Sequence, residues 1–225
     1  TWMVDPALEL QPGGRIEGDV ILKKDKNQDS EVDANFSLNH VSLRLPRARK
    51  RTEGITGALQ FKGKTLQINV ERSRTGSSII SADIFITDFS HPRFKAGFDC
   101  EFLDITDFTD QSGQTPVMSW IDWIRANSVI QFLNQSRGNI SLKVAKGKTA
   151  YRTFSDFRSD FEGANGMLTV PKWQMNFADG TLRGTASLDL RPSTTRPLKI
   201  EFQGDQLNFD RIFVSDPNRV KLDGE

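Results

Sequence analysis

Apolar and polar residues alternate with a period of two along most of this chain. The clearest examples are 66–70, 82–86, 186–190 and 198–202. In a β-strand this alternation places the apolar side chains on one face and the polar side chains on the other. Clusters of Gly, Asn, Asp, Ser and Pro lie between the alternating segments, as at 62–64, 178–180 and 191–194, and favour turns. The pattern predicts a mainly β protein built from antiparallel hairpins.

The apolar positions also repeat along the chain. A reference set consists of Ala82, Ile84, Ile86, Phe94, Ala96, Phe98, Leu103 and Ile105. Adding 104 to each number gives Ala186, Leu188, Leu190, Leu198, Ile200, Phe202, Leu207 and Phe209, and subtracting 62 gives Val20, Leu22, Lys24, Val32, Ala34, Phe36, Val41 and Leu43. Because only Lys24 is not apolar, we predict a strand–turn–long strand unit that begins near residues 18, 80 and 184. The alternative is that unrelated antiparallel strands share the period of two.

One segment departs from the alternation and predicts a helix over residues 116–135. Thr115 is suited to the N-cap and Pro116 to the first helical position, and Gly138 can end the helix. One stripe of the helix consists of Val117, Trp120, Ile121 and Ile124, and Trp123 lies off that stripe. The two tryptophans permit a membrane-interface helix, and the alternative is a helix packed on the end of a sheet. Strands are predicted again at 140–144, 154–161, 167–170 and 173–177.

These elements divide the chain into three parts. Residues 1–113 are predicted to contain the first two β-repeat units, 114–138 a helical insertion, and 139–225 a third unit that is truncated at its C-terminus. No run of about 18 apolar residues is present, so the sequence predicts no membrane-spanning helix. We expect the chain to be a piece of a longer protein whose membrane anchor lies outside it.

Composition excludes several classes of protein. The net charge is +1, which gives no general attraction to nucleic acid. The single cysteine, Cys100, rules out an intramolecular disulfide, and its position in an apolar strand predicts a buried structural thiol. With 36% hydrophobic and 26% charged residues, the chain can bury only a thin core, which suits an elongated molecule.

A search for catalytic or metal-binding motifs yields no candidate. His40 and His91 are far apart in sequence, and neither has the spacing of a metal ligand. There is no nucleophile elbow, Walker loop or dinucleotide fingerprint. Residues 25–30 resemble the start of a calcium loop, but Ser30 and Phe36 stand where Gly and a bidentate Glu are needed. A charged hairpin tip is the better interpretation. We therefore predict no catalytic residues, no metal and no cofactor.

Basic residues cluster around Pro46. They are Arg44, Arg47, Arg49, Lys50 and Arg51. Such a cluster can hold a lipid head group or an acidic partner, and the last four are our candidates for that role. A solvated loop is the alternative. Stacking aromatic residues are not interleaved with the cluster, so nucleic acid is not expected.

The residues at 167–190 and 198–212 resemble the AsmA-like family of bacterial envelope proteins. The shared features are a short strand, a turn in which Gly180, Leu182 and Gly184 are spaced as in the family, and an alternating strand. A Pro-containing turn and a second alternating strand that begins at Leu198 follow. Residues 55–61 and 81–108 resemble a second copy. The resemblance covers most of the chain from about residue 14.

The resemblance implies a fold and a function. The fold is mainly β, a curved antiparallel repeat sheet, taco-like or an open sandwich, with an apolar concave face and, here, one inserted α-helix. The function is that of a non-enzymatic periplasmic segment of a protein anchored in the inner membrane of a Gram-negative bacterium. Such bridge-like lipid transfer proteins bind or conduct phospholipid along a hydrophobic β-groove for outer-membrane biogenesis and homeostasis.

The expected partner is phospholipid or another acyl-chain lipid. The groove candidates are Val20, Leu22, Phe36, Leu66, Ile68, Val70, Ile84, Ile86, Phe94, Phe98, Leu103, Leu188, Leu190, Ile200, Phe202, Leu207 and Phe209. Cap or membrane-contact candidates are Trp120, Ile121, Trp123 and Ile124. Two alternatives stay open. One is an envelope-assembly scaffold or protein-interaction module with a closed core and pairing-competent sheet edges. The other is a carbohydrate-active or hydrolytic β enzyme, for which the sequence offers no support.

Overall fold

The chain folds into a mainly β structure, analysed as a computed structural model that describes residues 13–23, 31–44, 50–108, 136–149, 152–189, 191 and 198–208. Within these residues the strands are β1 (Gly13–Lys23), β2 (Glu31–Leu43), β3 (Thr52–Lys62), β4 (Thr65–Thr75), β5 (Ser78–Thr87), β6 (Arg93–Asp104), β7 (Arg137–Lys148), β8 (Thr153–Ala164), β9 (Met167–Phe177), β10 (Gly180–Asp189) and β11 (Leu198–Asp205). A short 3-10 helix, η1 (Ile105–Phe108), follows β6. The prediction of a mainly β protein is confirmed.

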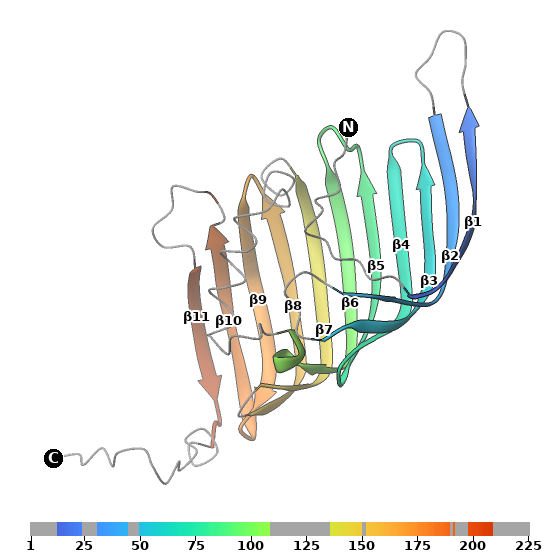
Figure 1. The fold of residues 1–225 in the computed structure, drawn as a ribbon. Coiled ribbons are helices and arrows are strands. Elements are labelled where there is room, and N and C mark those ends of the chain that lie inside the picture. The colour runs from blue at the N-terminus through green and yellow to red at the C-terminus, as the bar shows by residue number, and fades with distance from the viewer. Residues whose placement is uncertain are drawn as a thin grey trace, which may run out of the picture.

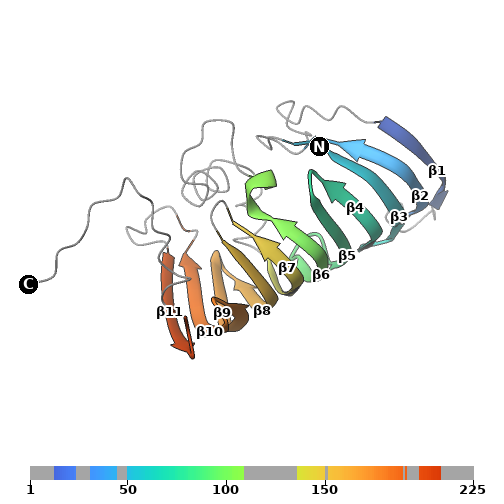
Figure 2. The same cartoon turned by 90° about the horizontal axis from the view of Figure 1, so that it is seen from below.

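All eleven strands form one open sheet in which spatial order equals chain order. Figure 1 shows the strands side by side from β1 to β11, and Figure 2 shows that they form a single layer. Among the described elements, strands contact their sheet neighbours, and no second sheet covers either face. The fold is therefore an open sheet and not a sandwich within these residues.

One junction departs from the expected antiparallel order, because β6 and β7 are parallel neighbours. Parallel neighbours require the chain to cross from one end of the sheet to the other between the strands. The chain leaves β6 through η1, and at the opposite end the Arg137 N–H donates to the Pro92 carbonyl at 2.9 Å. The long segment between the two strands permits this crossover, and the period-two pattern alone gave no reason to expect it.

The predicted strands and turns agree well with the structure. Residues 66–70, 82–86 and 198–202 lie in β4, β5 and β11, and residues 63–64 and 178–179 form turns. The predicted strands 167–170 and 173–177 are one strand, β9, because Pro171 lies at a β-bulge. A bulge accommodates proline since the residue there need not donate to the ladder.

The predicted helix lies outside the described residues, together with Trp120, Ile121, Trp123 and Ile124. The C-terminal end of the predicted insertion can be assessed. Arg137 and Gly138, which were assigned to it, are the first residues of β7. Gly138 is therefore a strand residue and not a helix stop.

The repeat prediction can be checked from hairpin registers. In β1–β2, Val20 is opposite Ala34, and in β10–β11, Ala186 is opposite Ile200, so both partners shift by 166 residues. Furthermore, His40 and Gln206, also 166 apart, have φ angles of 50° and 53°. The middle hairpin, β5–β6, has the same faces, but its register differs by two residues from the other two hairpins. The outer two units thus resemble each other more closely than either resembles the middle unit, a difference that the gap-free sequence alignment does not show.

A line of β-bulges crosses the sheet near one end of the strands. Register shifts occur between Leu38 and Val41 in β2, between Val70 and Ser73 in β4, and beside Glu101 in β6. A further shift lies between Ser155 and Arg158 in β8. Bulges bend strands and increase their twist. Figure 1 shows β2 and β3 turning sharply at their lower ends, as a row of bulges at one level requires.

Candidate functional site

Three rows of residues that are apolar or glycine, except for one serine, run across the whole sheet on one face. Residues opposite one another in a ladder place their side chains on the same face. The first row is Val20, Ala34, Phe61, Leu66, Ile86, Phe94, Gly138, Gly163, Leu168, Leu188 and Leu198; the second is Gly18, Phe36, Leu59, Ile68, Ile84, Ala96, Ile140 and Phe161, then Val170, Ala186 and Ile200. The third is Ile16, Leu38, Gly57, Val70, Ala82, Phe98, Leu142, Ser159, Trp173, Gly184 and Phe202.

The opposite face is polar. Its central row is Asp19, Asn35, Gln60, Gln67, Phe85, Lys95, Asn139, Glu162, Thr169, Ser187 and Lys199, in which Phe85 alone is apolar. Two shallow depressions lie among residues of this polar face. One of about 410 Å³ borders Glu17, Asp19 and Gln60, and one of about 250 Å³ borders Lys143, Arg158 and Lys172. The sheet is therefore amphipathic from β1 to β11.

Aromatic side chains fill the gaps that glycines leave on the apolar face. A methyl group added at Gly138 would lie 2.6 Å from Cγ of Phe94, and one added at Gly163 would lie 3.3 Å from Cζ of the same ring. The Phe94 ring therefore extends from β6 over two neighbouring strands. Likewise, a methyl group at Gly184 would lie 2.9 Å from the Trp173 ring. Rings packed over glycines on adjacent strands are a known way to stabilise such positions.

Burial on this face differs between the centre and the edges. Ala82, Ala96 and Val144 in central strands are 9%, 7% and 1% exposed. On the edge strands, Leu22 in β1 is 75% exposed and Phe202 in β11 is 70% exposed. The same apolar rows are therefore crowded in the middle and open at both edges.

Most predicted groove residues share this face. Val20, Leu66, Ile86, Phe94 and Leu188 are in the first row, Phe36, Ile68, Ile84 and Ile200 in the second, and Val70, Phe98 and Phe202 in the third. Leu22 extends the face at the edge, opposite Val32. Leu190 and Phe209 lie outside the described residues.

Leu103 and Leu207 lie beyond the bulge level. Leu103 is half-buried after the bulge at Glu101 and opposite Gly147. Leu207 covers Gly204, because a methyl group there would lie 3.0 Å from its Cγ. In each repeat the apolar positions change from even to odd numbers, or the reverse, at this level, as between Phe98 and Leu103. That change of parity was a sequence signal for the bulges.

The prediction missed the apolar residues of β3 and β7–β9. Examples are Leu59, Ile140, Leu142 and Trp173, which occupy the same rows. The groove candidates came mainly from the three repeat units, and these strands lie between the units. The alternation within each strand was the signal that could have identified them.

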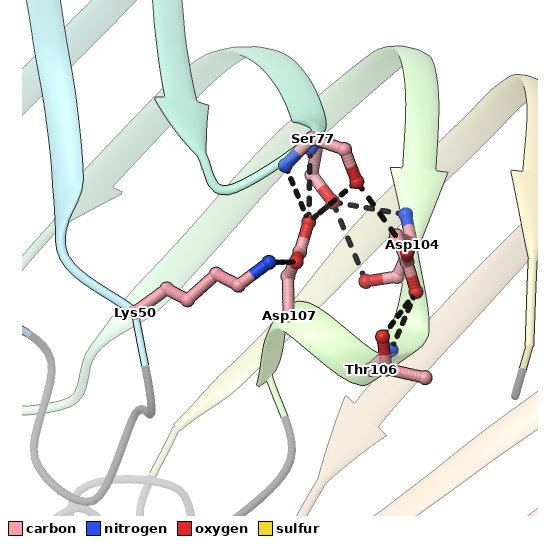
Figure 3. A network of polar contacts seen from close by, with 6 residues as sticks. Lys50, Ser77, Asp104, Thr106 and Asp107 are labelled. Carbon is pink, nitrogen blue, oxygen red and sulfur yellow. Dashed lines mark hydrogen bonds and ion pairs between the residues drawn. The ribbon is translucent and has the colours of Figure 1, made fainter.

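A buried polar corner lies beyond the bulge level, where η1 meets the β4–β5 turn (Figure 3). The side chain of Asp107 is fully buried. Its carboxylate accepts hydrogen bonds from the backbone N–H groups of Ser77 at 2.8 Å and Ser78 at 3.0 Å, and from both serine hydroxyls at 3.0 Å. Lys50 Nζ forms an ion pair with the same carboxylate at 2.5 Å.

Asp104 completes this corner. Its backbone N–H donates to the Ser78 hydroxyl at 2.9 Å, and its carboxylate accepts from the Thr106 N–H and hydroxyl at 2.9 and 2.6 Å. Nearby, the hydroxyls of Thr52 and Thr75 are 2.8 Å apart. These contacts join β3, the β4–β5 turn and the end of β6, so the corner fixes one end of the sheet.

The charge of Asp107 is stabilised by its partners. Burial acts to raise the pKa of Asp107, but hydrogen bonds from Lys50, Ser78 and Ser77 outweigh it, so the pKa lies below its ordinary value. Lys50 was a candidate for contact with a lipid head group or an acidic partner, and here it has an internal structural role. Arg51 also has interactions within the chain, while Arg47 and Arg49 lie outside the described residues.

This corner lacks the parts of a nucleophilic site. It contains no histidine, and His40 and His91 are both exposed elsewhere. In the described part of the chain, no three His, Cys, Asp or Glu residues group as a metal site would need. Among the same residues, no helix has the length and hydropathy to cross a membrane.

Cys100 is a free thiol on the apolar face and is 5% exposed. Burial, assisted by the charge of Asp99, raises its pKa to about 11. The thiol is therefore protonated at neutral pH, and the prediction of a buried structural cysteine is confirmed.

Comparisons with known proteins provide no assignment. Neither a protein-family model, nor a curated protein, nor a solved structure matches the chain. Any functional statement must therefore be supported by the sheet itself.

Proposed function

We propose that this chain binds acyl-chain lipid, phospholipid foremost, on the apolar face of its sheet. In this proposal it is a non-enzymatic periplasmic segment of an AsmA-like protein anchored in the inner membrane, and it conducts lipid for outer-membrane homeostasis. The observation that carries the proposal is that the three apolar rows extend across eleven strands with one polar residue among them. Acyl chains suit such a surface because they need contact area and few directed hydrogen bonds. Each buried CH₂ group contributes about 0.8 kcal/mol.

The proposal includes an apolar face on the concave side of the sheet, and two features support it. First, the bulges bend the strands at one level. Second, Ser78 is two residues before Ile80 in β5, on the side of the apolar rows, and its hydroxyl contacts Asp107 of η1. This contact indicates that η1 lies on the apolar side of the sheet, where it would form part of a wall at one end of the groove.

The direct test uses two phenylalanines on opposite faces. Phe98 is in the third apolar row, and Phe85 is in the central row of the polar face. Each is replaced in turn by p-benzoylphenylalanine, a conservative change at both sites, and crosslinking is induced in cells. We expect phospholipid adducts from position 98 and few from position 85.

Native mass spectrometry of the purified chain provides an independent measurement. We expect co-purifying phospholipid, and loss of most of it in the Ile84→Asn variant but not in the Phe85→Asn variant. The lipid proposal is wrong if no lipid is bound and crosslinking at position 98 captures none. Equal capture from both faces would also contradict it.

The exposed edges favour a second candidate, a protein-interaction scaffold. Ile16, Val20 and Leu22 on β1 and Ile200 and Phe202 on β11 are each more than half exposed. Unpaired edge strands with apolar side chains can accept a further strand. This candidate predicts protein adducts from crosslinkers on β11 and none containing lipid from Phe98.

A further inference from the structure

Ser159 in β8 is the only polar residue in the three apolar rows. It lies opposite Leu142 of β7 and Trp173 of β9, and the remaining positions of the rows are apolar residues or glycines. A serine at this position interrupts an otherwise continuous apolar surface near its middle. Packing with its neighbours does not explain a hydroxyl there.

The Ser159 hydroxyl is buried and has no hydrogen-bond partner among the described residues. The residue is 5% exposed, and Oγ has no hydrogen-bond partner in the described part of the chain. Leaving a buried polar group unsatisfied is energetically unfavourable. Native proteins rarely retain such a group unless a water, an ion or a functional contact uses it. The hydroxyl is therefore a donor that lacks its acceptor.

The surroundings of Ser159 can admit an acceptor. Leu142 and Trp173 are only half-buried. The Trp173 ring extends over Gly184 of β10, which is the neighbour on the side away from Ser159. Rotation of these two side chains would open a path to Oγ from the apolar face. The indole N–H of Trp173 is a second donor in the same row.

We infer that Ser159 donates a hydrogen bond to the ester carbonyl of an acyl lipid bound across β7–β9. This inference rests on the proposed lipid binding and narrows its ligand to acyl esters. An ester carbonyl is a strong acceptor directly attached to an acyl chain, whereas a hydrocarbon has no acceptor and an ether oxygen is a weak one. Ser159 thereby fixes where along the face the glycerol end of the lipid lies.

The test compares two synthetic lipids that differ only in this group. Diacyl phosphatidylglycerol and its dialkyl ether analogue have the same head group and chain length, and both are titrated into delipidated protein. One hydrogen bond of about 1 kcal/mol corresponds to a preference of roughly fivefold, so we expect the wild type to bind the ester about fivefold more tightly. Ser159→Ala should bind both equally, and Ser159→Thr should retain the preference.

A matched control is Ser141→Ala. Ser141 lies on the polar face beside Leu142, so this variant should keep the wild-type preference. Circular dichroism verifies that each variant is folded. Equal binding of ester and ether lipid by the wild type overturns the role of Ser159 and leaves lipid binding intact. If neither lipid binds, the proposed function fails and this inference fails with it.

Discussion

Ser78 and Ser159 show how differently the same residue can be used in one sheet. They are 0% and 5% exposed, on β5 and β8. The Ser78 hydroxyl contacts the Asp107 carboxylate and the Asp104 backbone, whereas the Ser159 hydroxyl has no partner within the part of the chain that the structure describes. At the corner, the serine hydroxyl takes part in contacts that hold strand ends together. On the apolar face, the Ser159 hydroxyl is buried without a partner among the described residues, and we propose that a lipid ester supplies one.

The first prediction concerns the centre of the corner. Asp107→Ala removes the acceptor of Lys50 and of the Ser77 and Ser78 N–H groups, so these donors lose their partner, and Ser78 is buried. Because Lys50 is about half exposed and can be solvated by water, the loss comes mainly from the buried Ser78 groups and should be about 2–3 kcal/mol. Urea denaturation should show this loss of stability. Asp99→Ala, on the exposed polar face, should change stability by about 0.5 kcal/mol or less. Equal effects of the two variants would mean that the corner is not a structural centre.

Titration with acid should affect the same corner. Because the pKa of Asp107 is lowered in the folded chain, its contribution to stability is fully present above the pKa of an unfolded aspartate, about 4. That contribution is lost as the pH falls through the lowered pKa. In the wild type, the urea concentration at the midpoint of unfolding should therefore decrease as the pH is lowered below about 4. Asp107→Asn should show a smaller fall over the same range, and an identical profile would argue against an ionised Asp107.

Replacing each of the two serines by alanine should change the stability of the protein differently. Ser78→Ala leaves the Asp104 backbone N–H without its acceptor and removes one of several donors to the Asp107 carboxylate, so a loss of about 1–2 kcal/mol is expected. Ser159→Ala removes a buried hydroxyl for which the described residues offer no partner, so the stability of the lipid-free protein should be unchanged or increased. Paired denaturation curves measure the difference. A loss of more than 1 kcal/mol for Ser159→Ala would show that its hydroxyl already has a structural partner.

The smallest effect is expected at Cys100. Because its pKa is raised to about 11, the thiol should react slowly with iodoacetamide at pH 8 in the folded chain and rapidly in urea. Cys100→Ser should lower stability slightly, by about 1 kcal/mol, since a polar hydroxyl replaces a buried thiol. Rapid labelling of the native chain would indicate that the apolar face opens readily around β6.

The period-two alternation was sufficient to predict which side chains share a face. That is because face depends only on the local parity of each strand, which the sequence displays directly. Registers were harder, since the β5–β6 hairpin differs by two residues from its relatives although its apolar positions coincide with theirs. Parity cannot distinguish registers that differ by an even number. The parallel β6–β7 junction also lies beyond what alternation can predict.

The corner around Asp107 could not be predicted, because it joins three separate parts of the chain, namely Lys50, residues 77–78 and residues 104–107. Lys50 stood in a run of basic residues and had no visible reason to differ from them. Ser159 was equally hidden. Ser159 lies within β8 like any other strand residue. Only the pairing of β8 with β7 and β9 shows that its neighbours across the sheet, Leu142 and Trp173, are apolar.

The single parallel junction has a geometric consequence for the ends of the sheet. In a purely antiparallel sheet of eleven strands, the first and last strands would point the same way. With β6 and β7 parallel, β1 and β11 point in opposite directions, as Figure 1 shows. Sheets of this kind placed edge to edge would meet as antiparallel neighbours with their apolar sides aligned. Because of this one parallel junction, copies of the sheet related by translation alone could pair edge to edge, with antiparallel strands and with their apolar faces on the same side.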